Sequence, residues 1–335
     1  MKANHNGTKD VYSDLSKVYS GYADGEIDTS GRGTMKANRK STKDVYSDLS
    51  KVYTGYADGE IDRDLFDFAT RLYAFEDARL FEYLVARIDA FIRAKELDRI
   101  RVLDIGCGPG TWLLRLHSHY RSQQCKVSGV GMDYAPGMIE DALAHKKTYC
   151  KKNKMKDIEI DFVIGDICEP LNQYDDSEFD ITLCLNTVLN HLPVAKMTDA
   201  IREIMRVTRG FNLTTVKPVG GLRTAYVCPV DDVRELRQVE DTLSFLDRDG
   251  HECVINSHLF VYYEICSLFQ SVARIRDCWG LGVCYSRFMA NRASDQGLPR
   301  EDLVQAEIEA IEEKLSRKPH MIDLANHILI LATQK

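Results

Sequence analysis

The stretch that most constrains this chain is residues 102–110, with the sequence VLDIGCGPG. An apolar run ends in an acidic residue and passes into a turn with glycine at alternate positions, and an apolar, helix-like segment follows at 111–116. Glycine lets a backbone turn sharply and approach a ligand without a Cβ in the way. The N-terminus of the following helix offers unpaired N–H groups. The order of strand, turn and helix therefore predicts a nucleotide-sized ligand site in an α/β fold.

The spacing of the glycines separates the possible ligands. A dinucleotide fingerprint needs G-x-G-x-x-G, but here Gly110 comes one position too early. A Walker loop ends in Gly-Lys-Ser/Thr, and no such ending is present. The spacing therefore argues against a nicotinamide-dependent reductase, although another nucleotide-binding α/β enzyme stays an alternative.

The pattern strand-Asp-x-Gly-x-Gly-x-Gly resembles motif I of the class I S-adenosylmethionine (SAM)-dependent methyltransferases. Further matches follow in order: a second strand over 126–132 ending at Asp133, a third-strand segment at 160–167, a fourth strand over 179–186 running into 187–193, and an apolar helix at 201–207 before a fifth strand at 211–216. The resemblance implies a Rossmann-like, seven-stranded and mostly parallel sheet with an antiparallel last strand. It also implies helices on both faces and an N-terminal helical lid.

The resemblance also assigns cofactor contacts. An acidic residue ending the second strand, here Asp133, holds both ribose hydroxyls, because a carboxylate accepts two hydrogen bonds at once. Asp166 accepts from the adenine amino group, and Met138 packs beside the ring. The predicted SAM-binding residues are Asp104, Gly106, Cys107, Gly108, Gly110, Asp133, Tyr134, Met138, Asp166, Ile167, Leu185 and Asn186.

The catalytic and substrate candidates rest on their place in the predicted sheet. His191 follows the fourth strand at the carboxyl edge, where ligands bind, so it is the candidate general base; the alternative is a packing residue. Arg287 can bind a carboxylate in a bidentate fashion, or form a surface salt bridge. The substrate candidates are Tyr53, Tyr56, Asn190, His258 and Arg287. Tyr46, Tyr53 and Tyr56 are lid candidates, with surface packing as the alternative.

The N-terminal region contains a duplication. Residues 1–28 and 35–62 are near copies that differ at His5/Arg39, Asn6/Lys40, Gly7/Ser41 and Ser20/Thr54. Helical repeat arrays generally need about three copies, so we expect only the second copy to be integrated into the fold.

Three regions are therefore expected: a loosely held duplicated segment at 1–34, a helical lid region at 35–98, and a methyltransferase domain at 99–335. A substrate-side insertion is expected at about 217–270, with a charged helix or partly mobile segment at 232–250 and a strand within 251–261. Helices are expected at 63–97, 262–269 and 301–317, and strands at 273–279 and 327–332.

Composition narrows the function further. The net charge of −7 argues against a nucleic-acid partner. No apolar run is long enough to span a bilayer, and the polar N-terminus has no signal-peptide core. The ten cysteines show neither C-x-x-C nor zinc-finger spacing, so we expect free thiols and no metal. A cytoplasmic monomer or homodimer is expected.

These observations predict an enzyme that transfers a methyl group from SAM to oxygen or nitrogen of a small molecule, in specialised metabolism. The acidic charge and the absence of an RNA-binding appendage favour a small acceptor. Two alternatives keep the fold: a non-catalytic SAM-binding partner or regulatory subunit, and a methyltransferase acting on a macromolecule.

Overall fold

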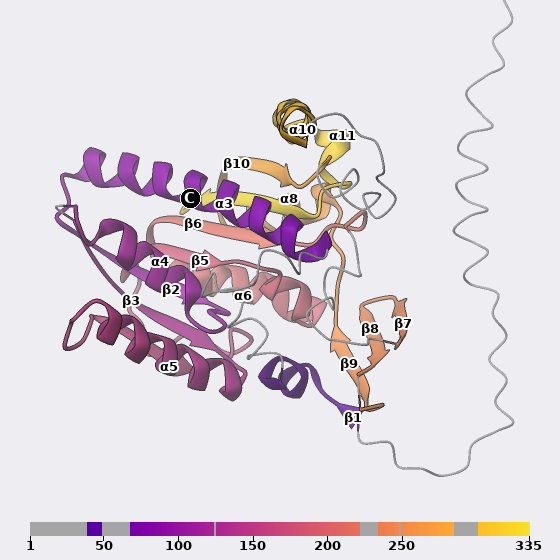
Figure 1. Ribbon diagram of the computed structural model, residues 1–335, viewed down its shortest axis with the longest axis horizontal. Coiled ribbons are helices and arrows are strands. Elements are labelled where there is room, and N and C mark those ends of the chain that lie inside the picture. The colour runs from indigo at the N-terminus through magenta and orange to yellow at the C-terminus, as the bar shows by residue number, and fades with distance from the viewer. Residues whose placement is uncertain (1–38, 49–67, 124, 222–233, 248, 285–300) are drawn as a thin grey trace, which may run out of the picture. The chain divides into compact units, whose positions relative to one another are not determined.

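A seven-stranded sheet forms the centre of the computed structural model (Figure 1), which describes residues 39–48, 68–123, 125–221, 234–247, 249–284 and 301–335. The strands lie in the order β10-β11-β6-β5-β2-β3-β4. Their bounds are β2 Arg99–Ile105, β3 Lys126–Asp133, β4 Ile160–Ile164, β5 Phe179–Cys184, β6 Thr208–Val216, β10 Arg274–Leu281 and β11 His327–Thr333.

Pairing within this sheet is parallel except at β11, which is antiparallel to both of its neighbours, β6 and β10. β5 is buried along its whole length and β11 is buried up to its last residue. Continuous apolar strands are typical of a sheet covered on both faces. The Rossmann-like fold with an antiparallel last strand is therefore confirmed.

Helices cover both faces of this sheet. α3 Phe68–Lys95, α4 Thr111–Tyr120 and α5 Pro136–Lys152 share one apolar cluster, in which Leu84 and Leu113 are completely buried. α6 Val194–Val207 and α8 Tyr262–Val272 belong to the cluster on the other face, with Ile201 and Phe269 completely buried. Pro136 opens α5, where its missing N–H costs no hydrogen bond.

A second, four-stranded sheet has the order β1-β9-β8-β7, with β1 Arg39–Lys40, β7 Arg234–Val239, β8 Thr242–Leu246 and β9 Glu252–Asn256. It lies beyond the carboxyl ends of the parallel strands (Figure 1). The expectation of a charged helix or mobile segment at 232–250 is wrong for the described part of that range. Leu243 and Phe245 point inward at a spacing of two residues, which is the period of a strand, although charged neighbours mask the pattern.

The N-terminal arm, residues 39–48, joins this small sheet. β1 pairs in parallel with β9, and the arm continues as a helical segment over 42–48. Val45 on that segment packs with Leu243, Phe245 and Ile255 of the insertion. The arm and the insertion, separated by about 200 residues of sequence, therefore form one structural layer.

The remaining described helices are α10 Glu301–Leu315 and α11 Pro319–Ile322, with the short 3-10 helix η2 Val188–His191 after β5. Glu312 of α10 accepts the backbone N–H groups of Val283 and Cys284 at 2.9 and 2.7 Å, which fixes the end of β10. No helix within the described ranges combines the length and the apolar character that a membrane span requires.

Candidate active site

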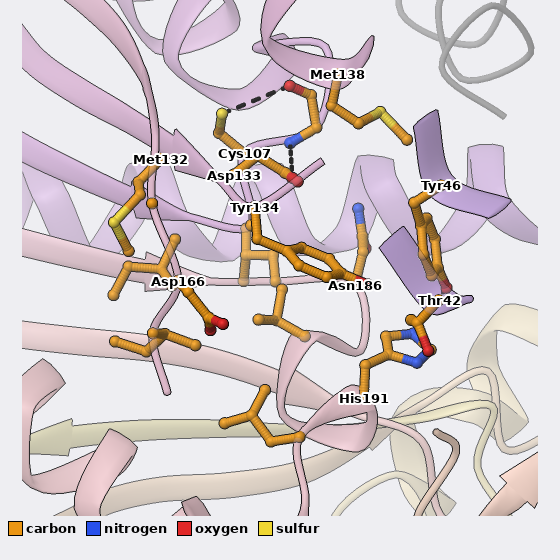
Figure 2. A pocket seen from close by; sticks show the side chains of 18 of the residues that line it. Thr42, Tyr46, Cys107, Met132, Asp133, Tyr134, Met138, Asp166, Asn186 and His191 are labelled. Atoms are coloured by element: carbon orange, nitrogen blue, oxygen red, sulfur yellow. Dashed lines mark hydrogen bonds between the residues drawn. The ribbon is translucent and has the colours of Figure 1, made fainter. Parts of the chain in front are cut away.

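A pocket of about 460 Å³ opens at the carboxyl ends of the parallel strands, a size in the range of small-molecule sites. Figure 2 shows Met132 and Asp166 on one side of it and Thr42, Tyr46 and His191 on the other. The pocket therefore joins the strand ends of the large sheet to the N-terminal arm.

The glycine loop after β2 forms one wall of the pocket. Gly106, Gly108 and Gly110 all have positive φ, between 52° and 82°, a region that glycine enters without a steric penalty. A Cβ on Gly106 would collide with Val188 of η2. A Cβ on Gly108 would meet only Met138 Sδ, at 3.9 Å. The loop therefore needs glycine at position 106 for close packing, whereas Gly108 stands where the wall is open.

Asp133 at the end of β3 is tied to this loop. Its Oδ2 accepts the backbone N–H of Gly108 at 3.0 Å, and its Oδ1 accepts that of Ala135 at 2.9 Å. Burial raises the pKa of Asp133, although these backbone hydrogen bonds oppose the shift. A carboxylate has about four acceptor positions, so Asp133 keeps acceptor capacity for a ligand hydroxyl beside its backbone hydrogen bonds.

Asp104 lies beneath the loop and is 1% exposed. Its Oδ2 has no hydrogen-bond partner among the described residues. Burial, with the nearby charge of Asp133, raises the pKa of Asp104 to about 8. A buried acidic oxygen without a partner carries a free-energy penalty that a cationic ligand in the adjacent pocket can reduce.

The opposite wall holds a hydrogen-bonded chain of three residues. The Tyr46 hydroxyl lies 2.7 Å from Nε2 of His191, and Nδ1 of His191 lies 2.6 Å from the carbonyl oxygen of Asn256. A carbonyl oxygen can only accept, so Nδ1 of His191 carries the proton and Nε2 accepts from Tyr46. The chain links the arm, η2 and β9.

Burial lowers the pKa of His191 to about 4, and the hydrogen bond to Asn256 only partly opposes the shift. The imidazole is therefore neutral at pH 7. A neutral histidine has the protonation state that a general base needs, but its low basicity limits it to acceptors that lose a proton readily.

Ten of the twelve predicted cofactor residues line the pocket: Gly106, Cys107, Gly108, Asp133, Tyr134, Met138, Asp166, Ile167, Leu185 and Asn186. Asp104 and Gly110 stand behind the lining. At Gly110 a Cβ would lie 2.5 Å from the Phe162 ring, so this glycine allows α4 to begin close to β4. The predicted base His191 also lines the pocket.

The structure does not bring the predicted substrate residues together. Asn190 is completely buried, and its amide bridges the backbone of Lys217 and the carbonyl of His258. The His258 ring lies between Asp241 Oδ1 at 2.6 Å and Glu264 Oε1 at 2.8 Å. Asn190 and His258 do not line the pocket. Tyr53, Tyr56 and Arg287 lie outside the described residues.

Five polar pocket residues were absent from the sequence prediction: Thr42, Asp77, Thr111, Lys196 and Asn256. Burial raises the pKa of Asp77 on α3 to about 6, against the opposing charge of Arg115. Thr42 Oγ1 accepts the backbone N–H of Asn256 at 3.2 Å. The lid candidate Tyr46 also lines the pocket, but no sequence pattern singled out Thr42 of the same segment.

One group of described residues has metal-ligand spacing: Asp247, Asp249 and His251. Asp247 Oδ1 already accepts the backbone N–H groups of Asp249 and His251, and its Oδ2 pairs with Lys40 Nζ at 2.8 Å. These hydrogen bonds and the ion pair stabilise the turn between β8 and β9, which accounts for the close spacing of the three side chains.

Residues 102–210 match the family model described as a methyltransferase domain. This span contains the glycine loop, Asp133, Asp166 and His191, so the resemblance to class I SAM-dependent methyltransferases is confirmed for this part of the chain. SAM is the cofactor of that class. No curated protein matches the chain.

Solved structures with a similar arrangement have low sequence identity. A SAM-dependent methyltransferase from Clostridium acetobutylicum is 13% identical, with 87% of this chain and 99% of that chain covered and a TM-score of 0.47. Magnesium protoporphyrin IX methyltransferase from Synechocystis, with bound S-adenosylhomocysteine, is 11% identical, with 87% and 98% covered and a TM-score of 0.48. The [4+2]-cyclase SpnF is 17% identical, with 88% and 97% covered and a TM-score of 0.46. Likenesses of this size say nothing about the acceptor of this chain.

Proposed function

We propose that this protein transfers a methyl group from SAM to an oxygen or nitrogen atom of a small molecule. The observation that carries the proposal is one pocket that joins the predicted cofactor residues to the Tyr46–His191–Asn256 chain beneath the N-terminal arm. A cytoplasmic location, a place in specialised metabolism and a monomeric or homodimeric state remain predictions.

The pocket residues suit SAM on three counts. Asp133 stands at the strand end that would hold the ribose hydroxyls, and Asp166 stands at the side expected to hold adenine. The unpartnered oxygen of Asp104 lies behind the glycine loop, where the positive charge of the cofactor's methionine end would stabilise it. The open wall at Gly108 leaves room for close approach.

When bound, SAM supplies an electrophilic methyl group on a sulfonium sulfur. The residues of the chain then have to orient the acceptor, exclude water and move a proton. The arm and β9 both contact the edge of the pocket at His191, through Tyr46 and Asn256. An acceptor proton can pass to the Tyr46 oxygen while the Tyr46 hydroxyl proton passes to Nε2 of His191.

The low basicity of His191 restricts the acceptor in this proposal. An acidic hydroxyl can lose its proton through Tyr46, and an amine that binds neutral already offers its lone pair. Lys196 is the one lysine or arginine among the described lining residues, against the acids Asp77, Asp133 and Asp166. A neutral or cationic small acceptor therefore suits the pocket better than a polyanion does.

A product screen tests this proposal. The full chain is incubated with SAM carrying a labelled methyl group and with fractionated metabolite pools, and the products are identified by mass spectrometry. The proposal predicts one labelled small molecule, absent with the Gly106→Val chain. SAM binding without any product would favour the non-catalytic subunit, and label only in a macromolecular fraction would favour a macromolecular acceptor.

A further inference from the structure

The arm makes three kinds of contact with the rest of the molecule through its helical segment, residues 42–48. Thr42 hydrogen-bonds the backbone of Asn256 at 3.2 Å, and Tyr46 hydrogen-bonds His191 at 2.7 Å. Val45 is 4% exposed and packs in the apolar cluster of the small sheet. Together these contacts define the surface on which the arm docks.

The first copy of the duplicated segment carries the same docking residues. Residues 8–14 have the sequence TKDVYSD, identical to residues 42–48. Thr8, Val11 and Tyr12 therefore correspond to Thr42, Val45 and Tyr46. Each residue with which the helical segment contacts the pocket or the small sheet therefore has an identical counterpart in the first copy.

Three of the four differences between the copies fall just before this segment, at residues 39–41. Lys40, whose counterpart is Asn6, pairs with Asp247 at 2.8 Å and with Asp48 at 2.9 Å. Hydrogen bonds from Lys40 and His251 outweigh the effect of burial and lower the pKa of Asp247 to about 2. Asn6 carries no charge with which to form this ion pair.

The third of these differences, Gly7 in place of Ser41, removes the N-cap residue of the helical segment. Ser41 Oγ lies 2.7 Å from Asp44 Oδ2, which also accepts the Ser41 N–H at 3.1 Å. The Asp44 N–H points back at Ser41 Oγ at 3.4 Å. This reciprocal pattern is that of a helix N-cap. Gly7 in the first copy has no side chain to form it.

We propose that residues 7–14 are a second, weaker ligand for the docking surface of the arm, acting within the same chain. When residues 41–48 leave, the first copy docks in their place and presents Tyr12 to His191. The proposal concerns docking alone and does not depend on methyl transfer.

The lengths of the two tethers support docking within one chain and set its strength. Asp48 lies 20 positions before the start of α3 at Phe68, and Asp14 lies 54 positions before the same point. The −3/2 power dependence of closure on length makes the longer tether about fourfold less favourable. With the lost cap and ion pair included, we expect the first copy to dock on the order of 50-fold more weakly than the second.

Matched substitutions in the two copies test the proposal. Hydrogen exchange of β9 amides, with Asn256 foremost, is measured in the full chain as wild type, Val11→Asp, Val45→Asp and the double variant. A buried aspartate without a partner opposes docking in either copy. Exchange of the β11 amides serves as the control for global folding, because β11 is a buried strand of the large sheet.

The proposal predicts that Val11→Asp leaves β9 protection unchanged. It also predicts that the β9 amides of Val45→Asp stay at least severalfold more protected from exchange than those of the double variant. This difference should persist when the protein is diluted a hundredfold. Equal protection in Val45→Asp and the double variant would overturn the proposal. Protection of Val45→Asp that is lost on dilution would show docking from a second chain and would overturn the assignment to the same chain.

Discussion

The hydroxyl of Tyr46 lies 2.7 Å from Nε2 of His191 and so ties the N-terminal arm to the turn after β5. Removing this hydroxyl should weaken arm docking by about 1 kcal/mol, the net value of a buried hydrogen bond. We expect Tyr46→Phe to speed exchange of the Asn256 amide about fivefold and to raise the acceptor KM.

The matched control for this substitution is Tyr263→Phe. Tyr263 is 70% exposed, so the same loss of a hydroxyl there should change neither quantity. Equal effects of the two substitutions would show that the Tyr46 hydrogen bond does not hold the arm.

Arm docking should depend on pH through His191. Its pKa falls to about 4 in the folded protein from an ordinary value of 6.5, so the unfolded chain binds more protons between these values. The contribution of His191 to stability therefore rises with pH across that window and is lost as pH falls from about 6.5 towards 4. Urea unfolding of the wild type and of His191→Gln between pH 4 and 7 checks this. The histidine-specific slope should be missing in the variant, and identical slopes would contradict the protonation state assigned to His191.

Close packing at Gly106 predicts a selective loss of binding. In Gly106→Val the new side chain would collide with Val188, and the residue would have to hold a φ of +67°. Gly250→Val places the same side chain at a φ of +80° with nothing within 4 Å. Both changes strain the backbone, but only Gly106→Val should abolish SAM binding in a calorimetric titration. Normal binding by Gly106→Val would show that the loop does not contact the cofactor.

The charge of Asp104 should couple cofactor binding to pH. Its pKa of about 8 keeps it largely protonated at pH 7 in the unloaded protein, and a cationic ligand favours the ionised form. SAM affinity should therefore rise between pH 6 and 8 and then level off. Conversely, the contribution of Asp104 to the stability of the unloaded protein should fall as pH rises from 3.8 to about 8, because the folded state binds this proton more tightly. Asp104→Asn should bind SAM more weakly and without this pH dependence. A wild-type affinity that stays flat over the same range would rule the coupling out.

The sequence predicted the parts of the site whose chemistry is local. Residues 102–110 and Asp133 each mark the end of a strand by a pattern of only a few residues. Because the carboxyl ends of neighbouring parallel strands lie at the same edge of a sheet, these residues could be placed together from sequence. The β7–β8 hairpin was missed because its inward residues, Leu243 and Phe245, alternate within a run dominated by charge. Thr42 and Asn256 meet only through the pairing of β1 with β9, which no local pattern records.

Residues near the site in sequence were the least predictable. Asn190 directly precedes His191, yet its amide turns inward to hold the backbone of Lys217 and His258. The direction of a side chain on a short 3-10 helix depends on which backbone groups of the surrounding elements require a hydrogen-bond partner.

Isothermal titration of SAM into the wild type and Asp133→Ala tests the central claim most directly. We predict one SAM site per chain, weakened by about 1.5–3 kcal/mol in the variant, which is the cost of losing a charged hydrogen-bond acceptor. A matched titration with NADH should give no binding. Unchanged SAM affinity in Asp133→Ala, or binding of NADH in place of SAM, would contradict the account.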